Sequence, residues 1–445
     1  MSSDAVSRPI AAGARKPGGE AATVHQAAQV VEALLLLGRL LLASGDAVSD
    51  INLRLRAIAA TWGAPDVQFI VLPDLMLVSF DPTEPAHIMS RDLAADHLRL
   101  DQVIRLLSLS DRAQLGEVPP DEAIAELRRL ETVRHRRPVL MPIVGTIIVT
   151  LGMALLFRPD DASILLLLGL GSLVGLMEAL SSRVAGMTAI LPVLASFVAS
   201  VVAFLVTRRG ITAPIEALVP ALTILLPGAL LTMSAVDLAA GDVVSGSSRF
   251  LEGLLQLALL AFGIFAAATL TDVQPSATHA HGSGFAAWVP WLGVPVFVLG
   301  IALRESAPLR MIPWLLLVLY VTHASQLLGD LLFGALLSGF VGTLITVPLV
   351  LYLERFRTAP PAFALFLPAF LMLVPGSLGL LGVSELASPQ SDELSGLITA
   401  LSAVLAIAMG ILVGTRATRI AGAARQAGGQ LHRTIRLPSG WPPKR

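Results

Sequence analysis

The sequence LLPGALLTMS, Leu225 to Ser234, places a proline and a glycine inside an apolar segment of membrane-spanning length. A second stretch of this kind, LVPGSLGLLG, runs from Leu373 to Gly382. Proline lacks the N–H that a helix interior needs and clashes with the preceding turn, while glycine is conformationally loose. Two apolar helices are therefore predicted to break near their centres.

An offset of 148 residues relates the two breaks and extends well beyond them. This offset aligns the first apolar segment through the fourth without a gap, over about a hundred residues. The aligned pairs include Pro142 and Pro290, Gly145 and Gly293, Gly152 and Gly300, Gly186 and Gly334, Pro227 and Pro375, Gly228 and Gly376, and Asp237 and Glu385. A constant offset over such a length indicates an internal duplication.

The composition is typical of a polytopic membrane protein. Of 445 residues, 55% are hydrophobic and 14% charged, and the mean hydropathy is +0.76. The net charge of −1 gives no indication of a nucleic-acid partner. The chain has no cysteine, which excludes disulfides, thiolate metal sites and cysteine nucleophiles.

The distribution of charged and apolar residues divides the chain into five regions. We predict a disordered leader (1–24), a small cytoplasmic α+β domain (25–137), a first membrane repeat (138–271), a second membrane repeat (286–416) and a basic cytoplasmic tail (417–445). The predicted fold class is a mainly α polytopic membrane protein, with ten transmembrane helices arranged as two inverted five-helix repeats behind the α+β domain.

The α+β domain is predicted from local patterns. A helical pattern from Val30 breaks at Gly45, two strands flank a turn at Pro73–Asp74, and two amphipathic helices follow. Its carboxylates, Asp46 among them, are interpreted as caps and turns, because no histidine or nucleophile-elbow pattern accompanies them. The apolar helical face from Val30 to Leu42 is compatible with pairing to a second copy.

The ten expected spans are defined by apolar runs of membrane-crossing length. They are 139–157, 163–182, 187–207, 213–232, 250–271, 286–303, 311–328, 331–353, 361–384 and 394–415. Arginines of the short loops gather on the side of both termini, which predicts that both termini are cytoplasmic. Because each repeat has an odd number of spans, the second repeat would run opposite to the first, as in alternating-access transporters.

The breaks are the predicted substrate site, because discontinuous helices place free N–H and carbonyl groups near the membrane midplane. A simple proline kink is the alternative, since proline is common in membrane helices. The candidate substrate-binding residues are Pro227, Gly228, Thr232, Ser234, Pro375, Gly376 and Ser377.

Ionisable and polar residues at membrane depth are candidates for proton or ion coupling, or for gating. They are Glu178, Asp237, Glu385, Gln326, His323 and Asp330. As alternatives, Asp237 and Glu385 would be solvated loop carboxylates, and Glu178 would snorkel beside Arg183. Arg249 is expected to neutralise Asp237 or Asp242.

Enzyme and cofactor motifs are missing from the sequence. There is no Walker A, Rossmann or HExxH pattern, and His279 and His281 are interpreted as loop polarity. We therefore expect neither a catalytic function, nor a metal site, nor a cofactor.

The chain resembles the threonine/serine exporter family. The resemblance rests on LLASGDAVSDINLRLRAIAATWG (Leu41 to Gly63), LLPGALLTMSAVDLAAGDVVSGSSR (Leu225 to Arg249) and LVPGSLGLLG, and on an α+β domain followed by ten spans. It implies export of small hydroxyl amino acids, driven by a proton gradient or the membrane potential, across the inner (plasma) membrane.

Two other functions remain as alternatives. A related branch with two separate membrane subunits is associated with dicarboxylate export, and a succinate-like substrate would call for centrally placed Arg or Lys, which the spans lack. A membrane-embedded hydrolase would need a nucleophile and a base. The expected partners are an amino acid, a proton and the lipid membrane; no nucleic acid is expected, and a homo-oligomer is left open.

Overall fold

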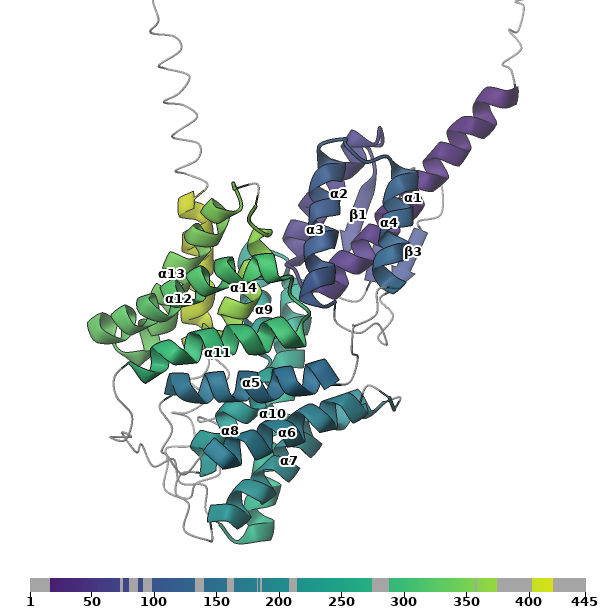
Figure 1. Ribbon diagram of the computed structural model, residues 1–445. Coiled ribbons are helices and arrows are strands. Elements are labelled where there is room, and N and C mark those ends of the chain that lie inside the picture. The colour runs from purple at the N-terminus through teal and green to yellow at the C-terminus, as the bar shows by residue number, and fades with distance from the viewer. Residues whose placement is uncertain are drawn as a thin grey trace, which may run out of the picture.

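The computed structural model describes residues 17–72, 75–79, 87–90, 98–132, 140–157, 164–181, 183–184, 186–207, 214–273, 288–356, 358–373 and 402–418. Two hydrophobic cores organise them. One lies within residues 17–132, hereafter the N-terminal domain, and the other joins the apolar helices of the remaining chain (Figure 1).

The N-terminal domain is an α+β unit. Its elements are α1 (Pro17–Ser44), α2 (Val48–Thr61), β1 (Gln68–Val71), β2 (Leu75–Ser79), β3 (His87–Ser90), α3 (Leu100–Gln114) and α4 (Pro120–Thr132). The three strands form one antiparallel sheet in the order β1-β2-β3, with Phe69 opposite Val78 and Met76 opposite Met89.

Buried and more exposed residues alternate along β1 and β2, and the buried face of the sheet packs on α1. Phe69, Val71, Met76 and Val78 are buried, as a sheet with one covered face requires. A Cβ built on Gly38 would lie 2.4 Å from the Met76 sulfur, so a glycine at this position lets α1 approach β2 closely. The apolar face of α1 is thus covered by its own domain, and no second copy is needed to bury it.

The N-terminal domain differs from prediction at two places. Strand β3 was not predicted, because HIMS is too short to show a clear alternation. Helix α1 begins at Pro17, inside the predicted leader of residues 1–24, since proline suits a first turn and Ala, Glu and Gln favour helix. The predicted break at Gly45 is confirmed, and the φ of this glycine is +84°.

The remaining chain is helical. Its elements are α5 (Leu140–Phe157), α6 (Ile164–Ser181), α7 (Met187–Thr207), α8 (Pro214–Leu222), η2 (Thr223–Leu225), α9 (Gly228–Ala240), α10 (Val243–Thr271), α11 (Val289–Arg304), η3 (Leu309–Met311), α12 (Ile312–Phe333), α13 (Ala335–Leu353), α14 (Ala362–Leu373) and a helix over Ser402–Thr418.

Five of these helices are long and apolar enough to cross a membrane, or six if the bent pair of α8–η2 and α9 counts as one span. Four shorter apolar helices, α5, α11, α14 and Ser402–Thr418, occupy the other predicted spans. The chain is therefore a membrane protein with several spans, and the number ten stays a prediction.

Helices α5 and α11 lie side by side at the centre of the helical region, with α6, α7 and α10 on one side and α12, α13 and α14 on the other (Figure 1). A Cβ on Gly152 would lie 2.4 Å from the Phe297 backbone nitrogen, and one on Gly300 would lie 2.5 Å from that of Val149. Small residues thus allow the two backbones to touch.

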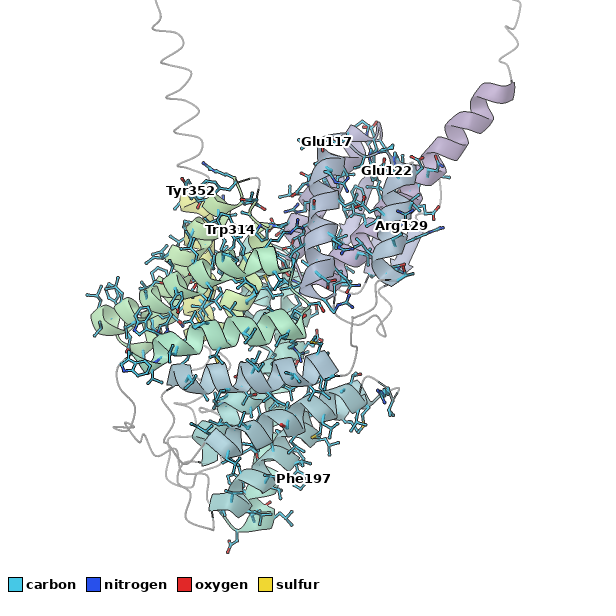
Figure 2. All side chains as sticks on the ribbon, viewed as in Figure 1. Glu117, Glu122, Arg129, Phe197, Trp314 and Tyr352 are labelled. Carbon is cyan, nitrogen blue, oxygen red and sulfur yellow. The ribbon has the colours of Figure 1, made fainter. Side chains whose placement is uncertain are left out.

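The N-terminal domain packs against the membrane helices (Figure 1). Leu100 and Ile104 of α3 belong to the core of the helical region, and Phe363 of α14 packs against the core of the N-terminal domain. Exposed charges such as Glu117, Glu122 and Arg129 lie on the N-terminal domain, while the exposed Tyr352 lies on α13 (Figure 2).

Candidate functional site

The first predicted break is present in the structure. Helix α8 ends at Leu222, one 3-10 turn follows, and α9 begins at Gly228 after Pro227, which has φ −80° and ψ 35°. The segments on the two sides of the break meet at an angle of 56°. Proline causes the break because it cannot supply the N–H that would continue the ladder.

Polar groups surround this break. The Gln256 amide of α10 donates to the Leu225 carbonyl at 2.7 Å, which stabilises one group freed by the break. The Thr223 hydroxyl donates to the Val219 carbonyl of α8, and the Ser234 hydroxyl donates to the Leu231 carbonyl of its own helix, α9. The Thr232 hydroxyl is fully buried and has no hydrogen-bond partner among the described residues.

This arrangement can bind a small polar molecule. The N–H groups of the first turn of α9 precede the first helical bond, which Leu231 donates to the Pro227 carbonyl at 3.0 Å. Such a helix N-terminus attracts a carboxylate. Thr232 lies one turn further along α9, so its hydroxyl is a second polar group near the break.

The second predicted break lies outside the described residues, since α14 ends at Leu373 and the next described helix begins at Ser402. The predictions for Pro375, Gly376, Ser377 and Glu385 therefore remain predictions.

Asp237 is a buried contact point, not a solvated loop residue. It lies in α9 and is 0% exposed. One carboxylate oxygen accepts a bond from Arg249 at 3.0 Å, and the other accepts the Val48 backbone N–H at 3.1 Å. Arg249 also donates to the Asp46 carbonyl at 2.9 Å. The predicted pairing of Arg249 with Asp237 is confirmed, and α9 extends eight residues beyond the predicted span.

Asp46 forms the turn between α1 and α2, as predicted. Its carboxylate accepts the Ala47 N–H at 2.9 Å. The side chain is buried, and burial together with the nearby charge of Asp50 raises its pKa to about 6. Arg54, Arg249 and the Ala47 N–H oppose this rise.

Glu178 of α6 is held by an arginine that the sequence interpretation missed. Arg304, the last residue of α11, donates to both oxygens of Glu178, at 2.6 Å and 2.5 Å, and to the Thr146 hydroxyl at 2.9 Å. The alternative of Glu178 snorkelling beside Arg183 is therefore replaced by an ion pair with Arg304. This pair joins a helix of residues 138–271 to one of residues 286–416.

The three candidates on α12 have different surroundings. The His323 ring packs edge-to-face with the Trp291 ring, and the two ring centroids are 5.1 Å apart. Gln326 packs under Gly342 of α13, where an added Cβ would lie 2.9 Å from its Cγ atom. Asp330 is exposed near the end of the helix.

The structure adds Arg304, Thr146 and Gln256 to the predicted polar residues, together with the Val48 N–H. Gln256 had a signal in the sequence, because an amide within an apolar segment needs a partner. Among the described residues, no group of three or more His, Asp or Glu could hold a metal ion.

A comparison of the sequence with family models identifies the family of the chain. Residues 32–271 match the ThrE model, described as "Putative threonine/serine exporter", which covers the N-terminal domain from α1 and the helices α5 to α10. No curated protein and no solved structure matches the chain. Because the matched residues are more than half of the chain, the protein belongs to the ThrE family of threonine/serine exporters.

Proposed function

We propose that the protein exports threonine and serine across the inner membrane by alternating access, and that it is not an enzyme. The observation that carries the proposal is the broken helix, where α9 starts without a side-chain cap and the buried Thr232 hydroxyl has no hydrogen-bond partner among the described residues. A zwitterion with a hydroxyl side chain complements this set of groups. The family match supports the same substrate class.

In this proposal the N-terminus of α9 takes the substrate carboxylate, because its N–H groups and dipole favour an anion. Thr232 hydrogen-bonds the substrate, and Pro227 and Ser234 shape the turn and the wall beside it. Pro375, Gly376 and Ser377 would supply the matching half of the site.

Inverted repeats are proposed from two findings. First, α6 and α12, α7 and α13, and α8 and α14 begin 148 residues apart in each pair, the offset that aligns the sequence. Gly186 and Gly334, related by the same offset, both have positive φ and lie directly before α7 and α13.

The second finding is the contact between α5 and α11. Gly152 lies against Phe297 and Gly300 against Val149, while Gly145 lies against Arg304 and Gly293 against Leu156. A shift of 148 residues turns the Gly152–Phe297 contact into the Gly300–Val149 contact, and the Gly145–Arg304 contact into the Gly293–Leu156 contact. Residue numbers rise along α5 as they fall along α11, so the two helices are antiparallel. A contact in which both partners use the same surface is called isologous. An inverted repeat predicts such a contact between two equivalent, antiparallel helices.

Proton coupling is proposed through Glu178. The Glu178 side chain is 28% exposed and that of its Arg304 partner is 16% exposed, so the pair is not closed off by the protein. Loss of the Glu178 charge would leave Arg304 paired with its neighbour Glu305, and this would loosen the contact between the two repeats. Asp237 is assigned a gating role, and Glu385, Gln326, His323 and Asp330 remain weaker candidates.

Dicarboxylate export is not favoured by the described residues. Arg249 is buried and Arg304 is partly buried, and each is already paired with a carboxylate of the chain. The short-loop arginines support a cytoplasmic location for both termini.

The proposal is tested with liposomes that contain the purified protein and are loaded with threonine, serine or succinate. We expect efflux of threonine and serine that a proton gradient accelerates. Efflux of succinate alone, or a leak without substrate preference, would contradict the proposal.

A variant pair tests the site itself. Thr232→Val should raise the KM for threonine roughly 5-fold, because one hydrogen bond is worth about 1 kcal/mol. Thr223→Val is the matched control, since the Thr223 hydroxyl is already bonded to the Val219 carbonyl of α8. Equal KM values in the two variants would remove Thr232 from the site.

A further inference from the structure

The carboxylate of Asp237 belongs to one half-helix but caps a helix of another domain. Helix α2 has Ala47 at its N-cap position and no side-chain cap of its own. The Asp237 oxygen that accepts the Val48 N–H supplies this cap across 189 positions of sequence. A carboxylate at a helix N-terminus interacts favourably with the backbone dipoles.

Arg249 completes the same contact. It neutralises Asp237 and donates to the Asp46 carbonyl, so it too touches both domains. The side chains of Arg249 and Asp237 are 6% and 0% exposed. The charges of Asp237 and Arg249 are therefore paired inside the protein, and this pair cannot exchange its partners for water without the domains moving apart.

Asp237 lies at the opposite end of α9 from the break. The helix begins at Gly228 beside Pro227, and Asp237 lies in its last turn before Gly241. The 13 residues of α9 make a rod of roughly 20 Å. A rigid rod held at one end transmits a change of angle to its other end, where the candidate substrate groups lie.

The N-terminal domain also contacts the second half of the membrane region. Phe363 at the start of α14 packs against the core of this domain, and α3 contributes Leu100 and Ile104 to the core of the helices. The domain thus contacts both halves, whose relative movement alternating access requires.

We infer that Asp237 is a positioning residue through which the N-terminal domain sets the angle of α9 and so controls the transport step. The domain acts as a brace that holds the Asp237 end of α9 while the two halves of the membrane region move. The inference rests on the proposed transport function. It assigns the N-terminal domain a regulatory part in transport, and it assigns Asp237, Arg249 and the Val48 N–H the contact that carries it.

Graded variants of Asp237 test the inference. Asp237→Asn keeps an oxygen for the Val48 N–H but loses the ion pair, while Asp237→Leu loses both. We expect the kcat of threonine export to fall roughly 10-fold in the first and further in the second, with the KM changed less than about 3-fold. Glu252→Gln, an exposed carboxylate on the same helix as Arg249, is the matched control and should keep the parent values.

Docking is measured separately from transport. Because the chain has no cysteine, Ala47→Cys introduces a single thiol, at a side chain that is 3% exposed beside the contact. We expect a maleimide to label this thiol roughly 10-fold faster in the Asp237→Asn background than in the parent or in Glu252→Gln.

The outcomes separate the two claims. Faster labelling with unchanged kcat and KM would show a merely structural contact and overturn the inference. Unchanged labelling in Asp237→Asn would overturn it as well. A parent protein that moves neither threonine nor serine would instead overturn the proposed function.

Discussion

Two arginine–carboxylate pairs, Asp237–Arg249 and Glu178–Arg304, differ in what surrounds them. The first is almost completely buried, has one N–O contact at 3.0 Å, and gives its remaining groups to backbone partners. The second is partly exposed, is bidentate, and meets a threonine hydroxyl. A closed pair suits a contact that holds two domains, whereas an accessible pair suits one that opens during a cycle.

The largest effect on stability is expected when Arg249 is removed from the buried Asp237–Arg249 pair. Arg249→Ala leaves the Asp237 charge unpaired in the interior and should lower the free energy of unfolding by about 3–5 kcal/mol. Thermal unfolding of the detergent-solubilised protein measures this. Arg310→Ala, an exposed arginine, is the control and should change little. Equal melting temperatures for both variants would place Asp237 in contact with water.

The next effect is the pH dependence of stability that the neighbouring Asp46 carboxyl causes. Burial raises the pKa of Asp46 from 3.8 to about 6, so the folded state holds a proton that the unfolded state has lost. The free energy of unfolding should therefore fall as the pH rises from about 4 to 6, by at most about 3 kcal/mol.

Asp46→Asn should remove this part of the pH slope, as melting temperatures between pH 4 and 8 would show. The charges that face Asp46 are those of Asp50 and Arg54 on α2 and Arg249 on α10, and these remain in the variant. An unchanged slope would mean that another group titrates.

The close contact of α5 with α11 also positions the Glu178–Arg304 pair, because Arg304 is the last residue of α11. Gly152→Ala places a methyl group 2.4 Å from the Phe297 backbone and should cost about 1–3 kcal/mol of stability, with loss of transport. Gly169→Ala on α6 is a matched control, since nothing lies within 4 Å of its added Cβ. Equal stability in both variants would contradict the close approach of α5 and α11.

The smallest effect on stability is expected at the accessible pair itself. Glu178→Gln should change the free energy of unfolding by less than about 1 kcal/mol, because partly exposed ion pairs contribute little. Threonine export should nevertheless fall roughly 10-fold and lose its response to a proton gradient. Gln326→Glu, which places a carboxylate at the position related by the repeat, tests whether that position can substitute. A Glu178→Gln protein that still responds to the gradient would assign coupling to another group.

The features that were predictable from sequence have local causes. Proline and glycine at 227 and 228 break a helix wherever they stand, and Gly45 adopts a positive φ that other residues resist. The offset of 148 was also visible, and α6 and α12, α7 and α13, and α8 and α14 begin 148 residues apart in each pair.

The pairings across the structure were not predictable in this way. Arg304 and Glu178 are 126 positions apart, and their contact depends on how α6 and α11 pack. The Val48 N–H has no signature at all, since every residue except proline carries such a donor. Sequence patterns indicated which residues were polar and apolar, and only the packing of helices decided which of them meet.

The antiparallel glycine contact of α5 and α11 has the form of a homodimer interface enclosed within one polypeptide. In a dimer of separate five-helix chains, this contact would have to compete with dilution in the bilayer. A covalent connection replaces that competition with an effective concentration of about the millimolar range. The contact can therefore re-form after each opening, as the proposed alternating-access movement of the two halves would require.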